Sequence, residues 1–253
     1  MKRFEGDVVP KNLLVVLAAL LLAAGCASDP ERELARKLER ADALFSAGEF
    51  IPAAEEWAEA AEIARDLGPR ANASLGSAYA GIGWVALESG QLGIAEDYFD
   101  RALHAKRAAG EYPSLDYGLI QSGLAAALER RGDIPAAIEW ARSAVQTQVE
   151  APGEVDGQAL ANARHQLARL LHKSQEAASS PAVQREAARL YGQVLTFQRS
   201  VLGEDSPDIV PYLRELEVFL VDLHDSPEMR EVRAEAEAIL SRAGFNLRET
   251  FSK

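Results

Sequence analysis

Small and apolar residues recur between residues 41 and 144 of this chain at a fixed spacing of 42 residues. Three columns of identical residues keep that spacing: Gly48, Gly90 and Gly132; Ala53, Ala95 and Ala137; and Ala60, Ala102 and Ala144. A bulky aromatic residue joins two of the units, as Trp57 and Phe99, and Ala141 interrupts that column in the third. Several columns locked to one period indicate an internal repeat, in which each unit buries its apolar face against its neighbours.

Each unit has the pattern of two amphipathic helices joined by a tight turn. In the second unit, residues 78–89 and 92–105 carry the helical spacing of apolar positions, and a glycine stands between them where it would end the first helix. Small residues recur where two helices must approach closely, at Ala41, Gly83 and Ala125. No stretch alternates apolar and polar residues for long enough to predict a strand.

These positions resemble the signature of the tetratricopeptide repeat. In the second unit the matching residues are Tyr79, Ile82, Gly83, Ala86, Gly90, Leu92, Ala95, Phe99 and Ala102. A period of 42 residues exceeds the usual length of that repeat by about two helical turns, as in its kinesin-light-chain-like variety. The resemblance implies an all-α fold, a right-handed superhelical solenoid of about five helix pairs over residues 31–244, followed by a tail at 245–253.

The fourth and fifth units depart from the regular pattern. An insertion around residues 175–181 lengthens the turn of the fourth unit, whose first helix is expected at about 160–173 with its register open by one residue. Residues 201–208 resemble the repeat end and connecting turn of the kinesin-light-chain-like variety. In the fifth unit, expected at about 208–243, Glu217 stands where a small residue belongs, which indicates a terminal repeat with a polar outer face.

The first residues have the pattern of a targeting segment. Basic residues precede an apolar run at 13–24, which is shorter than the stretch of about 20 residues that spans a bilayer. The run ends in Ala-Ala-Gly before Cys26, which resembles the lipobox of bacterial lipoproteins. That resemblance implies a signal peptide at 1–25, a lipidated Cys26 that carries palmitate-type acyl chains, and a short tether at 26–30. A secretory peptide cut at another small residue and a fortuitous apolar start are the alternatives.

The lipoprotein resemblance also implies a place in the bacterial cell envelope. Ala27 follows the cysteine, and it is not the aspartate that retains such lipoproteins in the inner membrane. We therefore expect the periplasmic face of the outer membrane, with partners close to that membrane.

Composition and charge argue against several classes of binding partner, metal site and enzyme. A net charge of −12 argues against nucleic acid as a partner, and a single cysteine excludes an internal disulfide or a cysteine-based zinc site. The four histidines form no metal motif, and no metalloprotease, serine-hydrolase or P-loop motif occurs. A GxGxxA string at 81–86 lies inside a predicted repeat helix rather than after a strand. We therefore predict no enzyme, no cofactor and no metal.

The resemblance implies that the first helices line a concave groove and that their non-packing positions bind a partner. The groove candidates are Asp42, Phe45, Trp84, Leu87, Glu88, Ser122, Glu129, Arg130, Arg169 and His172. Trp84, directly after Gly83, is the strongest of them, with packing against a neighbouring repeat as its alternative role. The residues assigned to repeat packing are Gly48, Ala53, Trp57, Gly83, Gly90, Ala95, Phe99, Gly132 and Ala137.

These inferences favour a membrane-anchored scaffold that holds an envelope protein, in a role of the assembly, secretion or pilus-biogenesis type. A non-catalytic regulator of a cell-wall enzyme is the alternative. An enzyme or a small-ligand receptor is a third class, and no motif supports it.

Overall fold

The computed structural model describes residues 29–153, 157–174, 180–203, 206–222 and 234, and within those ranges it contains helices and no strand. The α-helices are α2 (Pro30–Ser46), α3 (Phe50–Leu67), α4 (Asn72–Glu88), α5 (Leu92–Ala108), α6 (Leu115–Arg131), α7 (Ile134–Glu150), α8 (Gly157–Lys173), α9 (Pro181–Leu202) and α10 (Val210–Asp222). Two short 3-10 helices, η1 (Gly68–Ala71) and η2 (Pro207–Ile209), precede α4 and α10. No helix in these ranges combines the length and the apolar character needed to cross a membrane.

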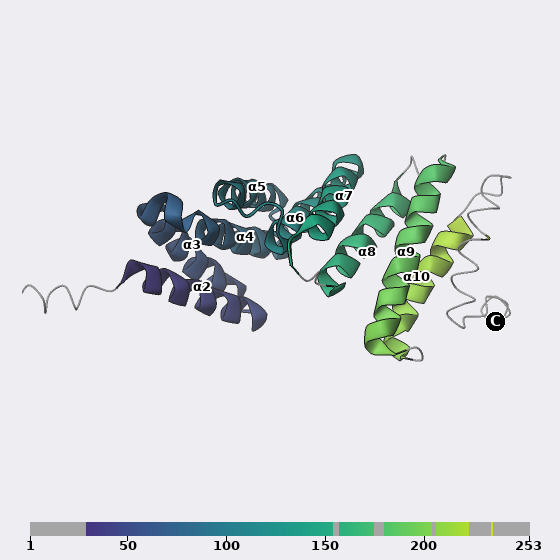
Figure 1. Ribbon diagram of the computed structural model, residues 1–253, viewed down its shortest axis with the longest axis horizontal. Helices are drawn as coiled ribbons and strands as arrows, with labels where there is room; N and C mark the ends of the chain where they lie inside the picture. The colour runs from purple at the N-terminus through teal and green to yellow at the C-terminus, as the bar shows by residue number, and fades with distance from the viewer. Residues whose placement is uncertain (1–28, 154–156, 175–179, 204–205, 223–233, 235–253) are drawn as a thin grey trace, which may run out of the picture.

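Successive helices pack in pairs, and the pairs follow one another along the long axis of the molecule (Figure 1). Helix α2 packs on α3, α4 on α5, α6 on α7 and α8 on α9, and α10 follows as the first helix of a fifth unit. First helices also contact those of adjacent units, because α4 touches α2 and α6, and α6 touches α8. The predicted all-α solenoid of repeated helix pairs is therefore confirmed.

Several predictions fall on parts of the chain outside the described residues. These are the signal peptide at 1–25, the lipidated Cys26, the insertion at 175–179, most of the second helix of the fifth unit, and the tail at 245–253. The side chain of Glu217 also lies outside them. The proposed tether ends at the start of α2, where the Asp29 side chain accepts a hydrogen bond from the backbone N–H of Glu31 and caps the helix.

The three periodic glycines end the first helices of their units. Gly48, Gly90 and Gly132 have φ values of +79°, +74° and +91°, which a residue with a side chain rarely adopts. After each of them, a backbone N–H donates to a carbonyl five residues earlier, as in the bond from Gln91 to Ala86 at 2.8 Å. Nothing lies within 4 Å of a Cβ placed on any of the three. Their assignment to repeat packing is therefore wrong, because they act through backbone conformation at the turn.

The periodic alanines are fully buried where helices pack on one another. Ala53, Ala95 and Ala137 have no exposed surface, and the same holds for Ala60, Ala102 and Ala144. A methyl group is the largest side chain that allows such close approach, and burial of a larger one would force the helices apart. The 42-residue period is thus a period of helix–helix contact.

Large aromatic rings of second helices lie against glycines of first helices. Trp57 of α3 lies so close to Gly81 of α4 that a Cβ there would come within 2.2 Å of the ring. Phe99 of α5 contacts Gly83 in its own unit and Gly123 in the next, at 2.8 and 2.7 Å from such a Cβ. Trp57 is 4% exposed and Phe99 is fully buried, so each ring fills the joint between consecutive units.

The fourth unit continues the stack with a shifted register. Ala168 of α8 is fully buried at the place that Ala125 holds in α6, one residue later than the 42-residue spacing predicts. Helix α9 has 22 residues, whereas α3, α5 and α7 have 18, 17 and 17. Phe219 of α10 and Leu170 and Leu171 of α8 are buried in the core that the later units share.

Candidate functional site

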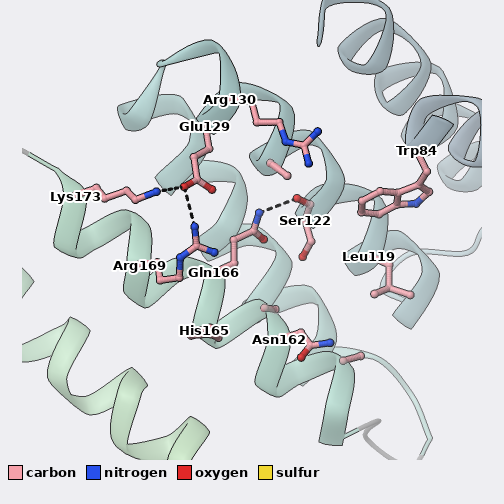
Figure 2. Close-up of a pocket in the computed structure, with 13 residues that line it drawn as sticks. Trp84, Leu119, Ser122, Glu129, Arg130, Asn162, His165, Gln166, Arg169 and Lys173 are labelled. Atoms are coloured by element: carbon pink, nitrogen blue, oxygen red, sulfur yellow. Dashed lines mark hydrogen bonds and ion pairs between the residues drawn. The ribbon is translucent and has the colours of Figure 1, made fainter. Parts of the chain in front are cut away.

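Among the described residues, three neighbouring cavities lie along the first helices. The largest, the central groove, has a volume of about 660 Å³ and runs between α4, α6 and α8 (Figure 2). Its lining residues are Trp84, Leu119, Ser122, Ala126, Glu129, Arg130, Ala159, Asn162, Ala163, His165, Gln166, Arg169 and Lys173. The N-terminal pocket, of about 330 Å³, lies between α2, α4 and α6, and the C-terminal pocket, of about 240 Å³, lies between α8, α9 and α10.

The structure brings most of the predicted groove residues to these cavities. Trp84, Ser122, Glu129, Arg130 and Arg169 line the central groove. Asp42 and Phe45 line the N-terminal pocket together with Trp84, and His172 lines the C-terminal pocket together with Arg169. The shared residues make the three cavities one continuous tract.

Two predicted groove residues lie elsewhere. Leu87 is 2% exposed and belongs to the hydrophobic core, so its prediction as a binding residue is wrong. It lies four residues after the buried Gly83, which places it on the same packed face of α4. Glu88 is exposed but lines none of the three cavities, and its carboxylate lies 3.7 Å from the guanidinium of Arg130.

Trp84 has both of the roles considered for it. Its ring packs edge-on against Phe99, with centroids 5.1 Å apart, and it also contacts Gly123 of the next unit. The rest of the indole is half-buried and lines both the N-terminal pocket and the central groove. Trp84 therefore connects the core of the repeat joint to the surface that a partner could reach.

Ion pairs between units hold the wall of the central groove. The Glu129 carboxylate of α6 accepts from Arg169 at 3.3 Å and from Lys173 at 2.6 Å, both of α8 (Figure 2). Gln166 of α8 donates to the backbone carbonyl of Ser122 at 3.0 Å. The Ser122 hydroxyl is itself buried and has no hydrogen-bond partner. These bonds cross from one unit to the next and fix the spacing of α6 and α8.

Arg130 closes the groove on the opposite flank. Its guanidinium donates to the backbone carbonyl of Leu87 at 2.5 Å, which ties α6 to the end of α4. Together with Arg169 and Lys173 it gives the central groove three cations against the carboxylate of Glu129. This part of the surface is therefore net positive in a chain whose net charge is −12.

At the C-terminal pocket, the side chains of α8 meet those of α10. His165 Nε2 lies in hydrogen-bond contact with Glu215 Oε2, and the His165 ring packs on Tyr212 with centroids 5.3 Å apart. Burial raises the pKa of Glu215, but the hydrogen bond and charge of His165, aided by Arg169, outweigh it and hold that pKa below its usual value. His172 packs edge-on against Phe219.

At the N-terminal pocket, a carboxylate lies among aromatic rings. Asp42 is an exposed residue, but partial burial of its carboxylate raises its pKa, and a hydrogen bond from Trp57 only partly offsets that effect. The ring of Phe45 lies 5.6 Å from that of Trp57, centroid to centroid. Lys106 also lines this pocket, and its ammonium is paired with Glu111 at 2.8 Å and Asp116 at 3.1 Å.

Sequence analysis missed several residues of this tract. Leu119 lines both the central groove and the N-terminal pocket and is 41% exposed. It occupies the position in α6 that Ser77 occupies in α4. Asn162 and Gln166 also line the groove from α8, at the places that Leu119 and Gly123 hold in α6 once the register shift is counted. The signal that could have found Leu119 is a large apolar residue outside every packing column.

Metal-ligating geometry is not found in the part of the chain that the structure describes. No group of three or more histidine, cysteine, aspartate or glutamate side chains in the described ranges is arranged to hold a metal ion.

Comparison with known proteins agrees with this architecture. The tetratricopeptide repeat family model matches residues 183–208, which cover most of α9 and the turn after it. No curated protein sequence matches the chain.

Solved structures share the fold at low sequence identity. A Podosopora anserina structure, described as kinesin light chain nearly identical TPR-like repeats, is 19% identical with a TM-score of 0.59, over 85% of this chain and 98% of that chain. BtubC (BKLC) from P. vanneervenii is 21% identical with a TM-score of 0.59, over 90% of this chain and 85% of that chain. At these identities the likeness is one of fold.

Proposed function

We propose that this protein is a membrane-anchored scaffold of the bacterial cell envelope that holds a partner protein along its first helices. The observation that carries this proposal is the central groove, where Trp84 and Leu119 present apolar surface between charged walls. Buried aromatic anchors within a polar rim are the usual energetic centres of protein–protein interfaces. Tetratricopeptide-type solenoids supply such surfaces without catalytic groups of their own, which supports a non-enzymatic role.

The charges of the tract support a partner segment that has its own polarity. The central groove and the C-terminal pocket carry the cations Arg130, Arg169 and Arg214, whereas the N-terminal pocket carries Asp42. Charge complementarity of this kind fixes the direction in which a segment lies and speeds its encounter.

The anchor rests on the sequence before the first helix. A lipid on Cys26 would be connected to α2, which begins at Pro30, by residues 27–29, and a chain of that length reaches little more than about 10 Å. The solenoid would then lie against the periplasmic face of the outer membrane, and its partners would be membrane-proximal.

Cross-linking in native membranes, followed by affinity capture and mass spectrometry, tests the scaffold role. The variants are Trp84→Ala and, as a matched control, Trp140→Ala, which removes a half-buried indole of α7 that does not line the groove. We expect an envelope protein to be captured by the wild type and the control and lost from Trp84→Ala. Capture that survives in Trp84→Ala would place the interface elsewhere, and no specific capture by any variant would remove the scaffold role.

The anchor is tested separately by metabolic labelling with palmitate. We expect label on the wild type and its loss in Cys26→Ala, together with release of the protein from the outer-membrane fraction. An unlabelled wild type would overturn the lipid anchor and leave the groove proposal intact.

A further inference from the structure

Building on the proposed function, we propose that the N-terminal pocket binds a positively charged side chain, an arginine or a lysine, of the partner segment. The pocket is formed by side chains of α2, α3, α4, α5 and α6 and has a volume of about 330 Å³. It therefore has the size of a small binding site, and it opens beside the central groove through the shared residues Trp84 and Leu119.

The charges of the pocket wall favour a cation. Among the described residues, no lysine, arginine or histidine forms an ion pair with the Asp42 carboxylate, whose polar contact is the hydrogen bond from Trp57. Lys106 brings a positive charge to the wall, but Glu111 and Asp116 both pair with it and leave the three groups with a net negative charge. An incoming cation would thus meet negative charge on both sides of the pocket.

The aromatic rings of the pocket add a second kind of attraction. Phe45, Trp57 and Trp84 line the cavity, and the faces of such rings attract lysine and arginine, most strongly when water is excluded. A planar guanidinium can stack on a ring while it donates to a carboxylate, which suits arginine best. A carboxylate and three rings in one cavity combine both contacts.

Other side chains fit this pocket poorly. An apolar side chain would cover the Asp42 carboxylate without supplying a charged partner, and burial of an unpaired charge is costly. An acidic side chain would be repelled by Asp42 and by the net negative charge around Lys106. The positively charged side chain alone satisfies both the carboxylate and the rings.

The test uses N-acetyl-arginine amide as the probe and N-acetyl-citrulline amide as its uncharged counterpart. Binding is followed by the indole N–H signals in two-dimensional NMR spectra of the intact solenoid, because Trp57 and Trp84 line the pocket and Trp140 does not. The variants are Asp42→Asn and, as a control, Asp66→Asn, which removes an exposed carboxylate of α3 outside the pocket. Circular dichroism establishes that both variants keep their helical content.

We expect the arginine probe to shift the Trp57 and Trp84 signals saturably and the citrulline probe to leave them in place. Asp42→Asn should weaken arginine binding by roughly fivefold, the value of one solvent-screened ion pair, and Asp66→Asn should not change it. An equal response to both probes, an equal response of Trp140, or unchanged binding in Asp42→Asn would overturn the inference.

This experiment is independent of the capture experiment for the scaffold role. A partner lost in Trp84→Ala combined with no arginine response would reject the cation pocket and keep the scaffold. An arginine response without any captured partner would reject the scaffold and keep the pocket.

Discussion

The two ends of the tract along the first helices have the same backbone architecture and opposite chemistry. At the N-terminal pocket, Asp42 lies among aromatic rings without a paired cation among the described residues. At the C-terminal pocket, Glu215 is paired with His165 and lies beside Arg169 and Arg214. The comparison shows that the repeat backbone fixes where side chains are presented, whereas the positions outside the packing columns decide what each end can bind.

Removal of the Phe99 ring, which supports the N-terminal pocket, should have the largest effect on the free energy of unfolding. Phe99 is fully buried, fills the joint between the second and third units, and supports Trp84 at the boundary of the N-terminal pocket. We expect Phe99→Ala to lower the free energy of unfolding by about 3–5 kcal/mol in urea denaturation. Phe50→Ala, at a ring that is 38% exposed, should cost far less, and equal losses would show that the joint is not where the stability lies.

Disruption of the close contact between Trp57 and Gly81 should have the second-largest effect on stability. A methyl group on Gly81 would overlap the indole, so Gly81→Ala should lower the free energy of unfolding by about 1–3 kcal/mol and move the Trp57 ring that forms the pocket wall. Gly93→Ala is the matched control, because Gly93 lies in α5 with nothing within 4 Å of a Cβ. Alanine is the better helix former, so the control should gain about 0.4–1 kcal/mol in the same denaturation experiment.

Loss of the ion pairs in the central groove should have a smaller effect. Glu129→Gln removes the carboxylate that Arg169 and Lys173 share, and these side chains are 39% and 52% exposed. We expect a loss of about 0.2–1 kcal/mol, which added salt should diminish. Glu139→Gln, an exposed substitution on α7, should leave stability unchanged, and a loss that is insensitive to salt would contradict an ionic origin.

The two carboxylates should respond to pH in opposite directions. The pKa of Glu215 is lowered in the folded chain, so its contribution to stability is present above the ordinary value of 4.5 and is lost as the pH falls through the folded value. The pKa of Asp42 is raised, so its contribution is present below the ordinary value of 3.8 and is lost as the pH rises through the folded value. Acid should therefore destabilise the contact of α8 with α10, whereas protonation of Asp42 should stabilise the folded state around the N-terminal pocket.

Carboxyl carbon signals in an NMR titration measure both pKa values directly. We expect the pKa of Asp42 to lie above its ordinary value and that of Glu215 to lie below its ordinary value. The substitution His165→Gln should raise the pKa of Glu215. Titration of both groups at ordinary values would remove the electrostatic part of the comparison between the two ends.

The fold was largely predictable because its packing repeats with the sequence. The alanines at 53, 95 and 137 are all fully buried, so the period alone predicts that these positions belong to the core. The ends of the first helices were predictable as well, although the packing role given to Gly48, Gly90 and Gly132 was wrong. A glycine column has two explanations, backbone conformation and close contact, and the spacing does not separate them.

The binding tract was less predictable, because it depends on the rotation of one unit relative to the next. Leu87 follows Gly83 by four residues and shares its packed face, whereas Trp84 follows Gly83 by one residue and remains partly at the surface. The bonds of Glu129 to α8 join residues about one repeat apart, at separations of 40 and 44 residues, across a boundary where the register shifts by one. A single sequence carries no measure of that rotation.

The contacts between neighbouring first helices also determine how the molecule bends. Within the described residues, each unit packs mainly on its neighbours in the stack, and these joints are held by the rings of Trp57 and Phe99 and by the bonds of Glu129. A partner segment that reached from Asp42 to Arg169 would connect the first unit to the fourth, which are not neighbours in the stack. Such a bound segment would hold these units together, so that the stiffness of the stack would depend on whether the partner is bound.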